Sequence, residues 1–189
     1  MPAQRESTQA SAGRGAGAGR GGKRKRWMTT TGCGPKRDEK MTPVLYFAYG
    51  SNLDDAQMRE RCANARVVGR ATLPNYVLVF GGFSHRWGGA VASVARTKGA
   101  HVEGLLYALD GVDLRALDRF EGHPFAYERV VKLVFDESGR RRRVMTYLQP
   151  EDGFEAWAPP RGYFTVLWRA YARLGFDFEP LARAAGVTP

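Results

Sequence analysis

The sequence predicts an α+β fold in which a small mixed or antiparallel β-barrel is flanked by helices. About seven short apolar or alternating segments have the period of strands, and three or four segments have the period of helices. They follow one another without a regular βαβ repeat, which argues against a parallel α/β sheet. With 189 residues, 43% of them apolar and 12% aromatic, the chain is long enough for one domain with a core but short for two.

The individual elements follow from local patterns. The apolar run at residues 44–49 predicts a buried strand, and Asn52 or Asp54 can cap the helix that follows it. Strands are predicted, in chain order, at 44–49, 67–71, 76–80, 90–95, 102–109, 127–135 and 142–148. Helices are predicted at 53–62, at 113–120 with Asp113 as the cap, and at 163–174. Residues 81–89 form a predicted glycine-rich loop, and Lys98-Gly99 a predicted turn.

The basic charge of the chain belongs mostly to its first 40 residues. The net charge is +10, and residues 1–40 alone hold ten Lys or Arg and three Asp or Glu. This segment alternates Gly, Ala and Arg and then runs through four cations at 23–26, with almost nothing apolar to bury. We predict a disordered arm at 1–40 and a domain at 44–189. Whether the arm binds a nucleic acid, or is an extension without a partner that a start at Met28 or Met41 would omit, stays open.

Several classes of protein are excluded by composition. No run of 18 apolar residues occurs, so no membrane-spanning helix is expected, and the N-terminus lacks the apolar stretch of a secretory signal. Cys33 and Cys62 lie far apart, without a CxxC or Cys/His cluster, which argues against a zinc site or a disulfide framework. We therefore expect a cytoplasmic protein without a metal or organic cofactor.

The junction Tyr49-Gly50-Ser51-Asn52-Leu53 links the first predicted strand to the first predicted helix. A glycine at this place lets the backbone approach a ligand, because no Cβ is in the way. The unpaired amides at the start of a helix suit a carboxylate or a developing oxyanion. The same pattern also serves for plain helix capping, so both interpretations stay open at this point.

A second candidate is Glu121, which is followed by Gly122 and so lies at the end of a predicted helix. A carboxylate at a helix C-terminus opposes the helix dipole, and this placement raises its pKa, as burial would. A raised pKa suits a carboxylate that must both accept and donate a proton.

Together these motifs resemble the γ-glutamylcyclotransferase family. The resemblance covers most of residues 44–175. It rests on the turn at 49–53, the segments 88–90 and 104–109, the stretch from Leu114 to Gly122, then Tyr127, the segment 146–148, and the segment 158–160 leading to Tyr163. The basic arm has no counterpart in the family pattern.

The resemblance implies a small mixed barrel whose cavity binds a γ-glutamyl compound. It assigns Glu121 as the catalytic acid and base, and assigns substrate contacts to the following residues: Tyr49, Gly50, Ser51, Asn52, Leu53, Tyr127, Tyr147 and Tyr163. The implied reaction forms 5-oxoproline and releases an amine, without a cofactor, in a monomer or homodimer. Two alternatives stay open: a binding protein of the same fold without turnover, and a nucleic-acid-binding protein acting through the arm. Which γ-glutamyl compound is the substrate is also open.

Overall fold

The computed structural model describes residues 42–151 and 154–187, so the predicted arm at 1–40 lies outside the described part. Five strands close into a barrel in the order β1-β3-β2-β4-β5. Their bounds are β1 Val44–Ala48, β2 Arg66–Ser84, β3 Gly89–Leu109, β4 Glu128–Asp136 and β5 Arg141–Leu148. The paired strands are antiparallel except β1 and β5, which meet in parallel at Tyr46 and Met145. The predicted mixed barrel is therefore confirmed.

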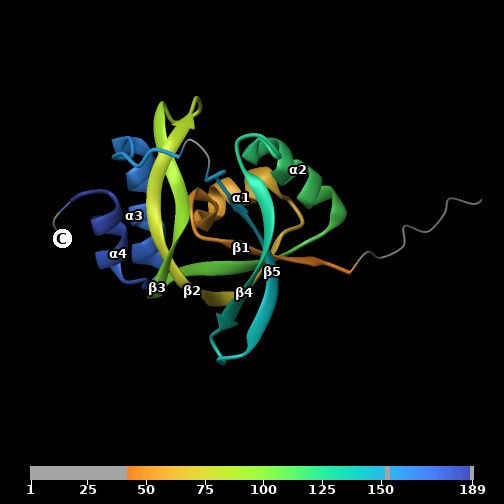
Figure 1. The fold of residues 1–189 in the computed structure, drawn as a ribbon. Coiled ribbons are helices and arrows are strands. Elements are labelled where there is room, and N and C mark those ends of the chain that lie inside the picture. Colours follow the sequence, from red (N-terminus) through yellow and green to blue (C-terminus); the bar gives the residue numbers. More distant parts are fainter. Residues whose placement is uncertain (1–41, 152–153, 188–189) are drawn as a thin grey trace, which may run out of the picture. The chain divides into compact units, whose positions relative to one another are not determined.

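Helices surround this barrel, as Figure 1 shows. They are the 3-10 turn η1 Ser51–Leu53, α1 Asp55–Arg61, α2 Gly111–Glu121, α3 Arg161–Leu174 and α4 Phe178–Ala184. α3 and α4 lie together beside the β2–β3 pair, whereas α1 and α2 contact each other. None of the helices in the described residues is both long enough and apolar enough to cross a bilayer.

Two long strands replace four of the predicted short ones. The predicted break at Leu73-Pro74 and the predicted turn at Lys98-Gly99 lie opposite each other, inside β2 and β3. The pairing shifts register there: Pro74 pairs with His101, whereas Tyr76 pairs with Arg96. The amide of Gly99 donates to Asn75 Oδ1 (3.0 Å), which ties the extra residues of β3 to the bend of β2. The strands bend at a bulge instead of ending, as bulged strands do.

The glycine-rich segment 81–89 is also more regular than predicted. β2 continues through Ser84, and only residues 85–88 form the turn to β3. Gly81 leaves room for another segment to approach β2 closely, because a β-carbon at this position would lie 2.4 Å from the Glu155 carbonyl oxygen. The strap formed by residues 154–157 therefore packs directly on β2, where the amide of Trp157 donates to the carbonyl of Phe80 (3.1 Å).

The helix caps settle where α1 and α2 begin. Asp54 caps α1, with its side chain accepting from the amide of Gln57 (2.8 Å), which is one of the two predicted caps. The prediction of Asp113 as the cap of α2 was wrong: Asp110 accepts from the amides of residues 112 and 113. Asp113 instead lies in the first turn of α2, where its side chain is buried and accepts from the amide of Asn64 (3.3 Å).

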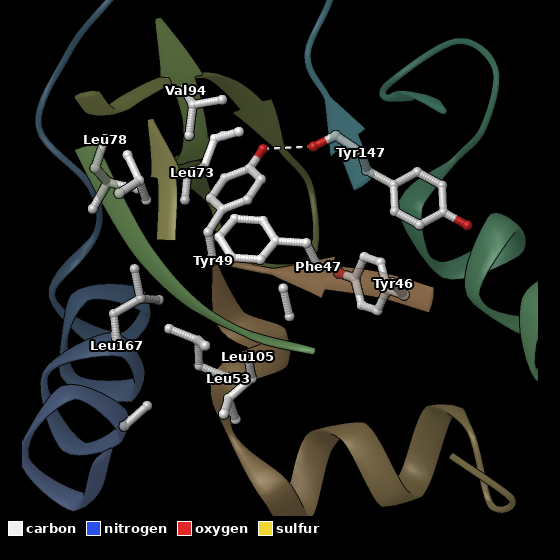
Figure 2. Close-up of a cluster of buried hydrophobic side chains, with 14 of the residues drawn as sticks. Tyr46, Phe47, Tyr49, Leu53, Leu73, Leu78, Val94, Leu105, Tyr147 and Leu167 are labelled. Carbon is white, nitrogen blue, oxygen red and sulfur yellow. Dashed lines mark hydrogen bonds between the residues drawn. The ribbon is translucent and has the colours of Figure 1, made fainter. Parts of the chain in front are cut away.

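The core forms around β1, whose side chains alternate between two faces. Phe47 and Tyr49 lie on one side with their rings 6.3 Å apart, and Tyr46 turns to the other side towards Tyr147 (Figure 2). The rings of Tyr46 and Tyr147 meet edge to face at 5.8 Å. All four are nearly inaccessible to solvent. A strand that is buried on both faces in this way holds the turn at its C-terminal end firmly in place.

Candidate active site

The turn after β1 brings its backbone unusually close to the barrel wall. A β-carbon on Gly50 would lie 3.3 Å from both the Ala92 β-carbon and the Tyr163 hydroxyl, which is tighter than ordinary contact. The amides of Leu53 and Asp54 are used within the turn and donate to the carbonyls of Gly50 and Ser51 (3.0 Å each). Within the described residues, the amides at positions 51 and 52 donate to no backbone carbonyl. The Ser51 amide lies against the Tyr163 hydroxyl, so the Asn52 amide is the one that remains for a ligand.

Glu121 is the last residue of α2, as the sequence predicts. Gly122 follows in the left-handed conformation (φ 64°), and its amide closes the helix on the carbonyls of Asp118 and Arg119. A glycine adopts this conformation without strain, so the helix ends sharply at this point. The side chain of Glu121 is left 13% exposed and turned towards η1.

Asn52 joins this carboxylate to the turn. Its amide nitrogen donates to Glu121 Oε1 (2.8 Å) and to the hydroxyl of Tyr46 (2.7 Å). Its amide oxygen accepts from Arg61 (2.8 Å) and, at longer range, from Gln57 (3.4 Å). Arg61 also contacts Glu121 Oε1 directly, at 3.1 Å. The turn, α1 and α2 therefore meet in one buried polar cluster, which consists of Asn52, Arg61 and Glu121.

Burial and charge act in opposite directions on the carboxyl group. Removal from water raises the pKa of Glu121 above its usual value, whereas the Arg61 guanidinium and the Asn52 amide lower it. The effect of burial is the largest, so the net direction is upward. A raised pKa makes a carboxyl group better able to both accept and donate a proton.

A cavity of about 520 Å³ opens beside this cluster. Its wall includes seven of the residues predicted to touch the substrate, together with the predicted acid and base: Tyr49, Gly50, Ser51, Asn52, Glu121, Tyr127, Tyr147 and Tyr163. They come from the turn that follows β1, from α2, β5 and α3, and from the loop before β4, so only the closed barrel brings them together. A volume of this size fits a small molecule such as a dipeptide.

Leu53 is the exception among the predicted site residues. Its side chain is completely buried, it does not line the cavity, and its amide is already used by the carbonyl of Gly50. Leu53 therefore supports the turn from beneath and is not available for contact with a ligand.

Three of the four predicted tyrosines donate their hydroxyl protons to acceptors within the protein, so these protons are not available to a ligand. Tyr49 donates to the carbonyl of Tyr147 (2.6 Å), as Figure 2 shows, and Tyr147 donates to Asp118 (2.8 Å). Tyr127 donates to the carbonyl of Ala92 (2.7 Å).

Tyr163 differs from the other three. Its hydroxyl accepts from the amide of Ala92 (3.1 Å) and lies against Ser51, and it donates to no backbone carbonyl of the described residues. Burial raises the pKa of Tyr163 to about 12, so this hydroxyl stays neutral at physiological pH and can donate.

Arg61 and Tyr46 are the residues of the site that the sequence did not reveal. Both line the cavity, and both hold Asn52. Arg61 lies on the same short helix as the exposed Arg59, and no local pattern distinguishes the two. Tyr46 reads as one more apolar residue in a buried strand. Among residues 42–151 and 154–187, no three His, Cys, Asp or Glu side chains gather as metal ligands would.

The comparisons with known proteins identify one family. Residues 46–165 match the family described as gamma-glutamyl cyclotransferase, AIG2-like. A gamma-glutamylcyclotransferase of Bos taurus is 32% identical over 167 residues, which are 86% of this chain and 88% of the bovine protein. The Mus musculus protein of that name is 26% identical, with the same coverage. A solved structure of a gamma-glutamyl cyclotransferase superposes with a TM-score of 0.69 at 25% identity, over 77% of this chain and 88% of the other.

Proposed function

Because the chain belongs to the gamma-glutamyl cyclotransferase, AIG2-like family, we propose that it is an enzyme that cyclises a γ-glutamyl amine or γ-glutamyl amino acid to 5-oxoproline. The free amine leaves. One observation carries the assignment to this cavity: the Glu121 carboxylate accepts a hydrogen bond from Asn52 of the glycine-containing turn, at the wall of a hollow of substrate size. Glu121 is the proposed acid and base.

The reaction is an intramolecular acyl transfer. The α-amine of the substrate attacks its own γ-carbonyl carbon, a five-membered lactam forms, and the bond to the leaving nitrogen breaks. Over the whole reaction the α-ammonium nitrogen loses two protons and the leaving nitrogen gains two. Glu121 accepts each proton and passes it on, so it ends in the state in which it began.

The turn supplies the groups that hold the substrate during this transfer. The Asn52 amide, which donates to no backbone carbonyl, and the hydroxyl of Tyr163 are the donors at the cavity wall. Donors that are already in place offset the charge on a tetrahedral oxygen without reorganising, and one such donor is worth about 3 kcal/mol. Folding the glutamyl chain into its ring-closing shape lowers the barrier further.

We expect Glu121→Gln to bind a γ-glutamyl compound but to release 5-oxoproline about 10²–10⁴ times more slowly, since the amide cannot accept the proton. Gln has nearly the same size and can still accept from Asn52. The measurement combines 5-oxoproline release with calorimetric binding, and Glu128→Gln, an exposed carboxylate outside the cavity wall, is the matched control.

Two results would count against the proposal. Near-normal turnover by Glu121→Gln would remove this residue from the chemistry. Tight binding of γ-glutamyl compounds by the unaltered protein, with no 5-oxoproline from any of them, would instead favour a binding protein of the same fold.

A further inference from the structure

The cavity has an outer part that the cyclisation itself does not use. Five residues form this mouth cluster: Phe83, Arg86, Trp87, Arg119 and Phe125. The first three lie on the β2–β3 hairpin, and the other two lie on the last turn of α2 and in the loop after it. The inner wall binds the glutamyl part in the proposed function, so the leaving part of the substrate has to extend into this mouth.

The mouth cluster carries uncompensated positive charge. Arg86 and Arg119 are exposed, and neither forms an ion pair with a carboxylate of the described residues. Among the described residues of the cavity wall, Glu121 is the only acidic one, and Arg61 already contacts it. A carboxylate that enters the mouth therefore meets two cations, whereas an ammonium group meets repulsion.

The same mouth is rich in exposed aromatic surface. Phe125 is 90% exposed and Phe83 is 60% exposed, although both border a concave site. Trp87 connects the mouth to the inner wall, because its ring meets Tyr163 edge to face at 5.1 Å. The guanidinium of Arg86 lies 5.8 Å from the centre of the Trp87 ring. Exposed aromatic side chains around a cavity are typical of a surface that binds an apolar group.

We propose that the mouth cluster selects the leaving group, and that the preferred leaving group is an amino acid with a free carboxylate and an aromatic or large apolar side chain. The carboxylate pairs with Arg86 and Arg119, and the side chain packs against Phe83, Trp87 and Phe125. Diamines and other cationic amines are poor leaving groups here because the arginines repel them. This inference rests on the proposed function, since it concerns the other half of the same substrate.

A matched set of substrates tests the inference. γ-Glutamyl-phenylalanine and γ-glutamyl-phenethylamine differ only in the carboxylate, γ-glutamyl-alanine lacks the ring, and γ-glutamyl-putrescine carries a cation instead. We expect kcat/KM for the phenylalanine compound to exceed that of the phenethylamine compound by about 10-fold, the worth of one charge-assisted hydrogen bond. The difference should appear in KM and not in kcat, because the carboxylate contact is present in both the ground state and the transition state. It should also shrink as salt is added, because salt screens exposed charges.

Variants assign the preference to the two arginines. Arg86→Gln and Arg119→Gln should each reduce the carboxylate preference about 3-fold, and the double variant should remove it. Arg86→Glu should increase the use of γ-glutamyl-putrescine relative to γ-glutamyl-phenylalanine. Arg115→Gln, an exposed arginine of α2 outside the cavity wall, is the matched control and should leave all ratios unchanged.

The outcomes separate this inference from the proposed function. Equal kcat/KM for the phenylalanine and phenethylamine compounds, or a preference that survives in the double variant, would overturn the role of the mouth cluster even while 5-oxoproline is released. If no compound is cyclised, the proposed function fails. Calorimetric binding of the same pair to Glu121→Gln then tests the mouth alone: a preference for the carboxylate supports the inference, and equal affinities overturn it.

Discussion

Asn52 can adopt only one orientation in its buried cluster. Its NH₂ group faces the Glu121 carboxylate and Tyr46, and its carbonyl oxygen faces donors on Arg61 and Gln57. Turning the amide by 180° would place an oxygen against a carboxylate and an NH₂ group against a guanidinium. Both contacts are repulsive, so the observed orientation is the one that the charges impose.

Arg61 tunes Glu121, and this gives a prediction about pH. Proton acceptance requires the ionised carboxylate, so kcat/KM should rise with pH through the pKa of Glu121, which lies above the ordinary value of 4.5. Arg61→Gln removes the cation that lowers this pKa, and the acid limb should move to higher pH. Arg61→Lys keeps the charge and should move it less. The measurement is a pH–rate profile, and Arg59→Gln on the exposed face of α1 is the control.

The same substitution should also destabilise the protein in a pH-dependent manner. Removing one partner from a buried ion pair costs about 3 kcal/mol, and the side chains of Arg61 and Glu121 are 5% and 13% exposed. A carboxyl whose pKa is raised by folding binds its proton more tightly when folded, so its contribution to stability falls as pH rises through that pKa. The loss of unfolding free energy in Arg61→Gln should therefore be largest near neutral pH and shrink on acidification. A loss that grows on acidification would contradict this assignment.

At the scale of residues, the sequence predicted the positions of Glu121 and the turn better than it predicted their contacts. Glu121 and the turn were recognisable because a helix end and a glycine turn have local signatures. Arg61 had none, because its role depends on the packing of α1 against α2, which no local pattern encodes. The four tyrosines were predicted to line one pocket and they do, but which hydroxyl keeps a free proton depends on the position of the Ala92 backbone.

At the scale of elements, the two ends of α2 determine where Glu121 lies. Asp110 fixes where the helix begins and Gly122 fixes where it ends, so Glu121 emerges at a defined height beside η1. Moving the cap from the predicted Asp113 to Asp110 adds almost one turn at the start of the helix but does not move its end. This explains why an error in the predicted start of α2 did not affect the predicted position of Glu121 at the end of the helix.

The strap over β2 gives a prediction about Gly81. In Gly81→Ala the new methyl group would lie 2.4 Å from the Glu155 carbonyl oxygen and from the Phe154 ring, so the strap must move away. The hydrogen bond from Trp157 to Phe80 would then be lost. We expect a loss of about 1–3 kcal/mol in unfolding free energy, measured by chemical denaturation.

Gly162 provides the matched control for this substitution. It lies in the first turn of α3, and nothing is within 4 Å of a β-carbon placed there. Gly162→Ala should leave stability unchanged or raise it by up to about 1 kcal/mol. If both variants lose stability equally, crowding under the strap is not the cause.

The strands show where sequence patterns reach their limit at this scale. Pro74 and Gly99 usually end strands, and each was interpreted as a break. Here the two irregularities lie opposite each other across the sheet, so one bulge accommodates both and the pairing continues. Only knowledge of which strands pair could have revealed this compensation.

At the scale of the molecule, we predict that the site does not need the basic arm. Of the residues that the structure describes, those of the polar cluster and of the cavity wall lie within residues 46–163. A chain that lacks residues 1–40 should keep the Tm and the rate of 5-oxoproline release of the full chain. Binding to a nucleic acid that is salt-dependent and disappears with this deletion would identify a separate role for the arm. A large loss of activity would instead show that the arm contributes to catalysis.

Closure of the barrel has a consequence for how the protein is made. β1 pairs in parallel with β5, joining Tyr46 to Met145, and Tyr163 of α3 completes the wall near Gly50. Partners so distant along the chain are slow to meet, because a long loop must close before their contact stabilises anything. During translation, the turn at residue 50 therefore leaves the ribosome well before its partners do. Because Tyr163 belongs to the cavity wall, we expect the complete pocket to form only after residue 163 has emerged from the ribosome.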